Sequence, residues 1–189
     1  PVPEKGNGSA SGASSRPGAY NRRMVVPKPP DVQPEPGWKP CDPFPASANA
    51  AASFVSGGPT GGRLRVAYFQ RTTDARLVGR AWFGPETQGP PGHAHGGSIA
   101  AVLDEALGAA AWAAGHPVLV ASLVVDFRRM VPLGTDATFE AWIDRTDGRK
   151  IHTCARLTDD QGIVLAEGRA LCVTLSDEHV VTLAVQAGY

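Results

Sequence analysis

The feature that most constrains the fold is one helix-length stretch, residues 96–114, that is apolar on nearly all sides. Its large apolar side chains are those of Ile99, Val102, Leu103, Leu107 and Trp112. Most of the remaining positions are alanine. A helix without a polar face must be enclosed by the rest of the protein. Gly115 and Pro117, which follow the stretch, are typical of the end of a helix.

Strand-like runs lie on both sides of this helix in the sequence. They cover residues 63–70 and 76–83 before the helix, and 118–129, 137–145, 150–158 and 163–175 after it. Turn residues at Asp147-Gly148 and at 159–162 indicate hairpins between the later strands. Strands segregated from a single helix predict an α+β fold with an antiparallel sheet. The simplest enclosure is one curved sheet that wraps around the helix.

Composition divides the chain near residue 45. Eleven of the 17 prolines fall within residues 1–45, together with many glycines and serines. We expect residues 1–45 to be a disordered or extended arm, 46–176 to be the folded domain, and 177–189 to be a C-terminal tail. The basic residues of the arm, Arg16, Arg22, Arg23 and Lys28, are read as a solvated segment, with a remnant of organelle targeting as the alternative.

Charge and cysteine content limit the classes of partner and compartment. The chain has 18 Lys and Arg against 18 Asp and Glu, so its formal net charge is zero. This balance predicts neither nucleic acid nor a membrane as a partner. No apolar run approaches the ~20 residues of a membrane-spanning helix. Three cysteines without a CxxC motif and the lack of a signal-peptide pattern favour a cytoplasmic protein, or an organelle matrix if the arm is a targeting remnant.

The helix begins with two glycines, Gly96 and Gly97. The first amides of a helix have no partner within it, and the helix dipole adds partial positive charge there. Glycines leave these amides open to a ligand oxygen. The start of the helix is therefore suited to hold a polarised carbonyl, as an oxyanion hole does. The alternative is a glycine-rich turn that only allows close packing.

Two adjacent carboxylates, Asp104 and Glu105, interrupt the apolar helix. Asp104 lies seven residues after Gly97, on the same face and ~10 Å further along the axis. One helix cannot bring both groups to a single carbonyl, whereas an antiparallel copy could, so the spacing predicts a two-fold dimer with composite sites. Asp104 is the candidate base or nucleophile. The alternative for both carboxylates is an exposed stripe or a paired structural charge.

The histidines before the helix are a weak metal signal. His93 and His95 form an HxH spacing, and the other histidines show no ligand-like spacing. We therefore expect no metal and no cofactor. His95 is expected to fix the loop before the helix or to touch the substrate carbonyl.

The stretch GPPGHAHGGSIAAVLDEALG (residues 89–108) resembles the His-Gly-Gly signature and helix of hotdog-fold acyl-CoA thioesterases. The branch it resembles holds the phenylacetate-pathway and mitochondrial long-chain enzymes. The similarity continues through LVVDFRRMVPLG (123–134) and DGRK (147–150) and spans about residues 60–175.

The resemblance implies a hotdog fold that dimerises through its sheets, as a homodimer or a dimer of dimers, with sites at the interface. It implies that the Gly97 amide polarises the thioester carbonyl and that Gly96 is one of the residues that bind the substrate. It further implies that Asp104 of the partner chain attacks or activates water, and that His95 shapes the oxyanion pocket. Val120 stands where the family usually has threonine, and Ser122, expected on the same strand face, is the candidate substitute.

The implied activity is hydrolysis of an acyl-CoA or acyl-carrier thioester. Arg128, Arg149 and Lys150 are candidate contacts for coenzyme A phosphates, with a solvated surface as the alternative. Two other functions stay open. One is hydration of an enoyl thioester on the same fold, using His95 with a carboxylate. The other is a non-catalytic module that binds acyl thioesters.

Overall fold

The computed structural model describes residues 28–44, 53–56 and 62–186. Most of the predicted arm, residues 1–27, lies outside the described residues. The described residues form a seven-stranded sheet of order β1-β2-β3-β5-β6-β7-β4, in which every neighbouring pair is antiparallel. The strands are β1 (Trp38–Pro40), β2 (Leu64–Arg71), β3 (Leu77–Phe83), β4 (Val118–Phe127), β5 (Asp136–Asp147), β6 (Lys150–Thr158) and β7 (Val164–Thr174).

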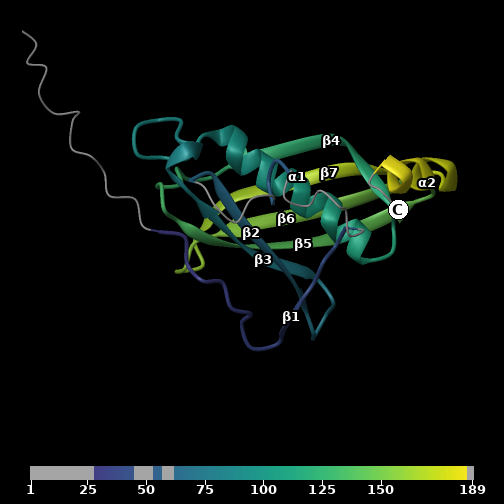
Figure 1. The fold of residues 1–189 in the computed structure, drawn as a ribbon, viewed down its shortest axis with the longest axis horizontal. Coiled ribbons are helices and arrows are strands. Elements are labelled where there is room, and N and C mark those ends of the chain that lie inside the picture. The colour runs from purple at the N-terminus through teal and green to yellow at the C-terminus, as the bar shows by residue number, and fades with distance from the viewer. Residues whose placement is uncertain (1–27, 45–52, 57–61, 187–189) are drawn as a thin grey trace, which may run out of the picture.

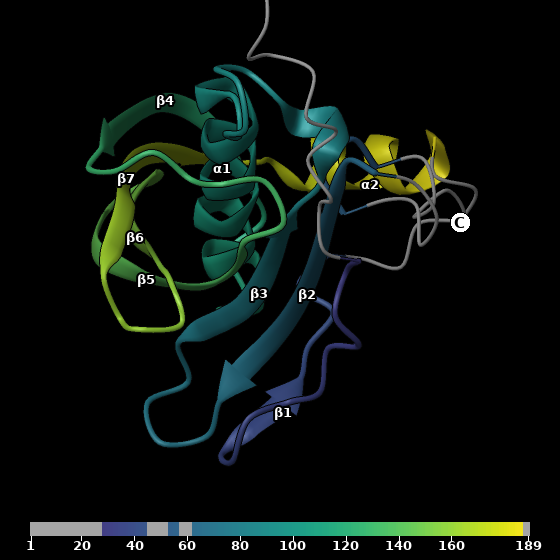
Figure 2. The same cartoon turned by 90° about the vertical axis from the view of Figure 1, so that its left-hand side faces the viewer.

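The sheet curves around the helix α1 (Gly96–Ala113), which contacts β3, β4, β5, β6 and β7 (Figures 1 and 2). Leu103, Ala106 and Leu107 of α1 are fully buried against the sheet. A helix that is apolar all round is stable only in such an enclosure. The predicted α+β class and the enclosed helix are therefore confirmed. None of the helices in the described residues is long and apolar enough to cross a membrane.

The sheet begins before the predicted boundary at residue 45. Strand β1 pairs with β2, and the ring of Trp38 packs against Phe69 with centroids 5.6 Å apart. Within the predicted C-terminal tail, a second helix, α2 (Asp177–Gln186), follows β7. A short 3-10 helix, η2 (Pro85–Thr87), leads toward α1. The proline-rich composition did not reveal β1 because its pairing depends on a partner about 30 residues away, Arg71 opposite Trp38.

Gly79 lets two aromatic rings meet across the middle of β3. It pairs with Tyr68 on one side and Phe139 on the other, and those two rings contact with centroids 5.6 Å apart. A Cβ at this position would lie 2.2 Å from Phe139 Cζ and 2.3 Å from the Ala67 carbonyl oxygen. The glycine is therefore required by the packing of the rings.

We expect Gly79→Ala to lower the free energy of unfolding by about 1–3 kcal/mol, the usual cost of overpacking a core. Chemical denaturation of the variant and of the wild type measures this difference. Gly148→Ala is a useful comparison, because no atom lies within 4 Å of a Cβ there and only the positive φ opposes the change. An unchanged denaturation midpoint for Gly79→Ala would contradict the packing role.

Candidate active site

His95 holds the start of α1. It is the residue before the helix, its backbone N–H donates to the Thr87 carbonyl at 2.7 Å, and its Nδ1 accepts a hydrogen bond from the Gly97 N–H at 2.9 Å. An Nδ1 that accepts a hydrogen bond carries no proton, so a neutral His95 ring has its proton on Nε2. These two hydrogen bonds anchor His95 in the loop before α1, and a contact between its ring and a substrate carbonyl stays a prediction. The exposed ring also presents an N–H donor.

The two glycines at the start of α1 differ in their amides. The Gly97 N–H is engaged by His95, whereas the Gly96 N–H has no hydrogen-bond partner among the described residues. Gly96 lines a pocket of about 340 Å³ together with Phe127, Arg128 and Arg129. The open amide at the helix terminus is thus that of Gly96, next to the predicted Gly97.

Asp104 is a half-buried carboxylate without a hydrogen-bond or ion-pair partner in the described part of the chain. Burial raises its pKa above the ordinary aspartate value. It lies at the wall of a cavity of about 730 Å³ whose other lining groups are mostly apolar, among them Trp112, Leu119 and Val120. An unpaired carboxylate in such surroundings is a candidate general base or nucleophile.

Glu105, one residue further, is bound on both carboxylate oxygens. The Tyr68 hydroxyl donates to Oε1, and the Ser53 hydroxyl donates to Oε2 at 3.4 Å. Burial, followed by the charge of Glu105, raises the pKa of the Tyr68 hydroxyl, so that hydroxyl stays a donor. Glu105 therefore fits the alternative that the carboxylate is a paired structural charge. Asp104 does not fit it among the described residues.

A β-bulge separates Val120 from Ser122. Val120 pairs with the buried Cys172, but Ser122 pairs with Leu171, because Ala121 is an extra residue in β4. One extra residue reverses the alternation of side chains along a strand. The prediction that Ser122 shares the face of Val120 is wrong. Ser122 lies on the face turned away from α1, so it cannot orient a water molecule beside Asp104 of its own chain.

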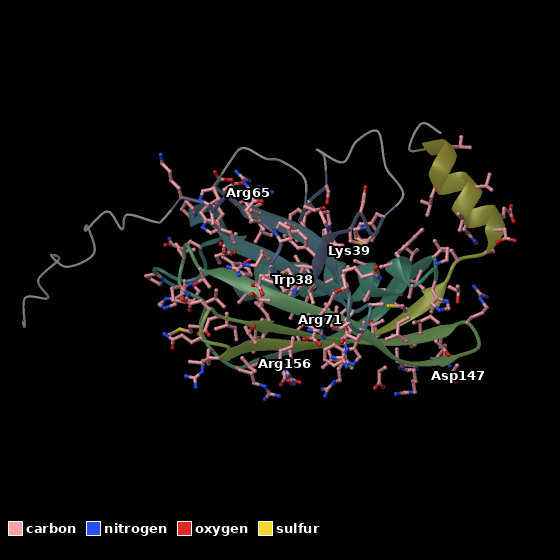
Figure 3. The ribbon with its side chains drawn as sticks, turned by 90° about the horizontal axis from the view of Figure 1, so that it is seen from below. Trp38, Lys39, Arg65, Arg71, Asp147 and Arg156 are labelled. Carbon is pink, nitrogen blue, oxygen red and sulfur yellow. The ribbon has the colours of Figure 1, made fainter. Side chains whose placement is uncertain are left out.

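The three candidate phosphate contacts lie at two ends of β7. Arg128 donates to Glu167 at 3.0 Å, and its backbone N–H bonds to the Leu165 carbonyl near the start of that strand. Arg149 donates to the Thr174 carbonyl at 3.1 Å, at the other end. Lys150 follows Arg149 in the hairpin whose Asp147 marks one end of the sheet in Figure 3. One protomer therefore does not bring Arg128 together with the other two.

The helix runs antiparallel to the edge strand β4. Its first residue, Gly96, is next to Phe127 at the end of β4, because a Cβ on Gly96 would lie 3.3 Å from Phe127 Cζ. Near the other end of α1, Trp112 Nε1 donates to the Val118 carbonyl at the start of β4. Gly96 and Asp104 are separated by eight residues, ~12 Å along the axis. Within one chain the Gly96 amide and the Asp104 carboxylate are therefore too far apart to reach one carbonyl group together.

Sequence reasoning missed several groups around these two pockets. Phe44 lines the cavity beside Asp104 although it precedes the predicted domain boundary, and Tyr68 binds Glu105 from a distant strand. Arg129 lines the pocket of Gly96. No motif marks these residues. In the sequence only the two adjacent carboxylates, Asp104 and Glu105, marked this region of the helix.

These features define an α+β domain with a sheet wrapped around one helix. Its apolar cavity holds a carboxylate that has no partner among the described residues. Residues 91–166 match the family model of the thioesterase superfamily. The acyl-coenzyme A thioesterase THEM4 of Xenopus laevis is 33% identical over 108 residues, which cover 57% of this chain and 49% of the relative. THEM5 of Mus musculus is 31% identical over 97 residues, covering 51% and 39%.

Solved structures show the same fold. A crystal structure of a thioesterase superfamily protein superimposes with a TM-score of 0.54 at 32% identity, over 58% of this chain and 53% of that one. The PaaI protein of E. coli, from the phenylacetic acid degradation operon, gives a TM-score of 0.53 at 15% identity, over 60% and 80%. Over residues 91–166 the chain is similar to the thioesterase superfamily, and the described residues have the hotdog fold. The chain spans about half or less of the length of the first two curated relatives.

Proposed function

We propose that this chain hydrolyses acyl-CoA thioesters to a free acid and coenzyme A. The observation that carries the proposal is Asp104, a half-buried carboxylate without a partner among the described residues, at the wall of a 730 Å³ apolar cavity. The curated relatives named acyl-coenzyme A thioesterases support the same reaction. The alternative substrate is an acyl group that is attached as a thioester to a carrier protein instead of coenzyme A.

In this reaction the carboxylate of Asp104 takes a proton from a water molecule while the water oxygen attacks the thioester carbonyl. Direct attack by Asp104, with later hydrolysis of the anhydride, is the alternative. The C–S bond then breaks, its electron pair leaves with the sulfur of coenzyme A, and the thiolate takes up a proton. The negative charge on the carbonyl oxygen is stabilised at the start of α1. We assign this contact to the open Gly96 amide, with the His95 Nε2–H as a second donor.

The working unit in this proposal is a homodimer joined through the edge strand β4. This strand is at one edge of the sheet and carries three exposed apolar side chains, Leu119 (59%), Val124 (48%) and Phe127 (53%). An exposed apolar edge is a ready site for pairing with another strand. Antiparallel pairing of two β4 strands sets the end of one against the start of the other. Gly96 of one chain then approaches Asp104 of its partner subunit.

The same two-fold arrangement supports a shared site for coenzyme A. Arg128 lies at the end of β4, while Arg149 and Lys150 lie near its start. Antiparallel pairing brings the Arg128 of one chain to the end occupied by Arg149 and Lys150 of the other. Arginine forks and lysine are suited to phosphate, so these three side chains are the proposed phosphate contacts.

Release of free thiol from a set of acyl-CoA substrates tests the proposed activity. The set includes acetyl-, decanoyl-, palmitoyl- and phenylacetyl-CoA, and we expect thiol release that is proportional to enzyme concentration. Crotonyl-CoA is followed separately at the enoyl absorbance. Loss of that absorbance without thiol release would favour a hydratase, and tight binding without either reaction would favour a binding module.

A further inference from the structure

The two adjacent carboxylates of α1 have different surroundings, and this difference carries a further inference. Asp104 has no partner among the described residues, while Glu105 is bound by Tyr68 and Ser53. Both carboxylates line the same cavity. Because a half-buried charge is costly unless it is hydrogen-bonded, the fixed geometry of Glu105 indicates a role in holding structure.

The partners of Glu105 hold a wall of the cavity that comes from the N-terminal part of the chain. This outer wall consists of Phe44, Phe54 and Val55, which line the cavity opposite α1 and β4. The Phe44 ring meets Tyr68 edge-on, with centroids 6.3 Å apart. Ser53, which donates to Glu105, immediately precedes Phe54 and Val55. One carboxylate therefore connects both parts of the outer wall to α1.

The ring of Phe44 also packs edge-on against Trp112, with centroids 6.4 Å apart, and Val55 is buried. These contacts fix the outer wall against the second half of α1. The outer wall lies outside residues 91–166, which match the thioesterase family model.

The size and lining of the cavity indicate what it holds. A volume of about 730 Å³ falls within the range of pockets that enclose drug-sized ligands, ~300–1,000 Å³. A two-carbon acyl group would leave most of it empty. Apart from the two carboxylates the lining side chains are apolar, including three aromatic rings, Phe44, Phe54 and Trp112. Such a lining favours a large apolar group and disfavours a polar one.

We propose that Glu105 is a positioning residue, which through Tyr68 and Ser53 holds the outer wall in place and so makes the cavity selective for bulky apolar acyl groups. The inference rests on the proposed thioesterase function. The acyl group is a medium or long aliphatic chain or an aromatic ring, attached through its thioester carbonyl near Asp104. Glu105 takes no proton from water and does not contact the reacting atoms.

The test compares kcat/KM for decanoyl-, phenylacetyl- and acetyl-CoA. In the wild type we expect decanoyl-CoA to exceed acetyl-CoA by more than tenfold, since each buried methylene contributes roughly fourfold. Glu105→Ala should lower this ratio by at least ~10-fold through the loss of the wall contacts. Tyr68→Phe removes the hydroxyl group and keeps the ring. It should also lower the ratio of kcat/KM for decanoyl-CoA to that for acetyl-CoA. The measurement with phenylacetyl-CoA shows whether the outer wall favours aliphatic chains or aromatic rings.

Glu105→Gln separates positioning from chemistry, because an amide can still accept from Tyr68 and donate to Ser53. We expect it to restore the ratio that Glu105→Ala loses. A matched control is Glu140→Ala, which removes a carboxylate bound by Arg71 and Arg76 on the outer face of the sheet. That change should leave the ratio of substrates as in the wild type.

Two results would overturn the proposal. One is an equal fall in kcat/KM for all three substrates in Glu105→Ala, and the other is a Glu105→Gln variant no better than Glu105→Ala. Binding of a decanoyl thioether analogue of coenzyme A, followed by Trp112 fluorescence, tests the wall without hydrolysis. Weaker binding of the analogue by Tyr68→Phe supports the wall even if no thiol is released, in which case only the proposed function fails.

Discussion

Replacement of Asp104 by asparagine is expected to lower thioesterase turnover by at least ~10²-fold, the low end for a lost acid–base group. Asparagine keeps the size of the side chain and removes its ability to accept a proton. Steady-state thiol release from the best acyl-CoA substrate measures the effect. Turnover near that of the wild type would remove Asp104 from the mechanism and with it the proposed reaction.

The same substitution should stabilise the fold at neutral pH. Burial raises the pKa of Asp104 in the folded state, so between the unfolded and folded pKa values the folded protein binds more protons. Stability then falls as pH rises through that interval, and the loss persists at pH 7. Asp104→Asn avoids it and should unfold at a higher temperature. This gain should shrink as pH is lowered toward the ordinary aspartate pKa, about 3.9.

The pH dependence of the wild-type reaction follows from the same shift. A general base works only when ionised, so kcat/KM should fall at low pH through a pKa above that of an ordinary aspartate. The isosteric Glu105→Gln serves as the control for Asp104→Asn, because it changes the neighbouring carboxylate in the same way. An acid limb that persists unchanged in Asp104→Asn would assign the titration to another group.

A mixed dimer of two inactive variants is expected to recover about half of the wild-type activity. One subunit carries Asp104→Asn and the other Gly96→Val, whose side chain would press on Phe127 and cover the open amide. Either change alone should lower turnover to about 1% or less, since an oxyanion donor contributes about 10²–10³-fold. Heterodimers purified through two different tags provide the measurement.

Recovery follows if each site takes Asp104 from one chain and the helix start from the other. The heterodimer then contains one doubly damaged site and one site in which both groups are native. If instead each chain supplied both groups to its own site, every site in the heterodimer would carry one lesion. Activity of about 1% in the purified heterodimer would therefore reject the composite site. The ~12 Å along the helix between Gly96 and Asp104 makes the composite arrangement the expected one.

Much of the fold could be predicted because it depends on local periodicity. The enclosed helix, predicted over 96–114, is found as Gly96–Ala113, and the six predicted strands appear as β2 to β7 with shifts of a few residues at their ends. The hairpin at Asp147-Gly148 forms as expected, with a positive φ of 55° at Gly148. Apolar alternation and turn residues encode these elements within a few neighbouring positions.

The sequence by itself determined that an apolar helix begins with two glycines and carries two carboxylates. Only the tertiary structure decided what each group meets. It places His95 Nδ1 on the Gly97 amide, Tyr68 on Glu105 across 37 residues of sequence, and Phe44 at the cavity. The bulge at Ala121 turns Ser122 away from the helix. Such contacts depend on strand register and on segments that are distant in sequence. A shift of one residue in the register moves every side chain of a strand to the other face of the sheet.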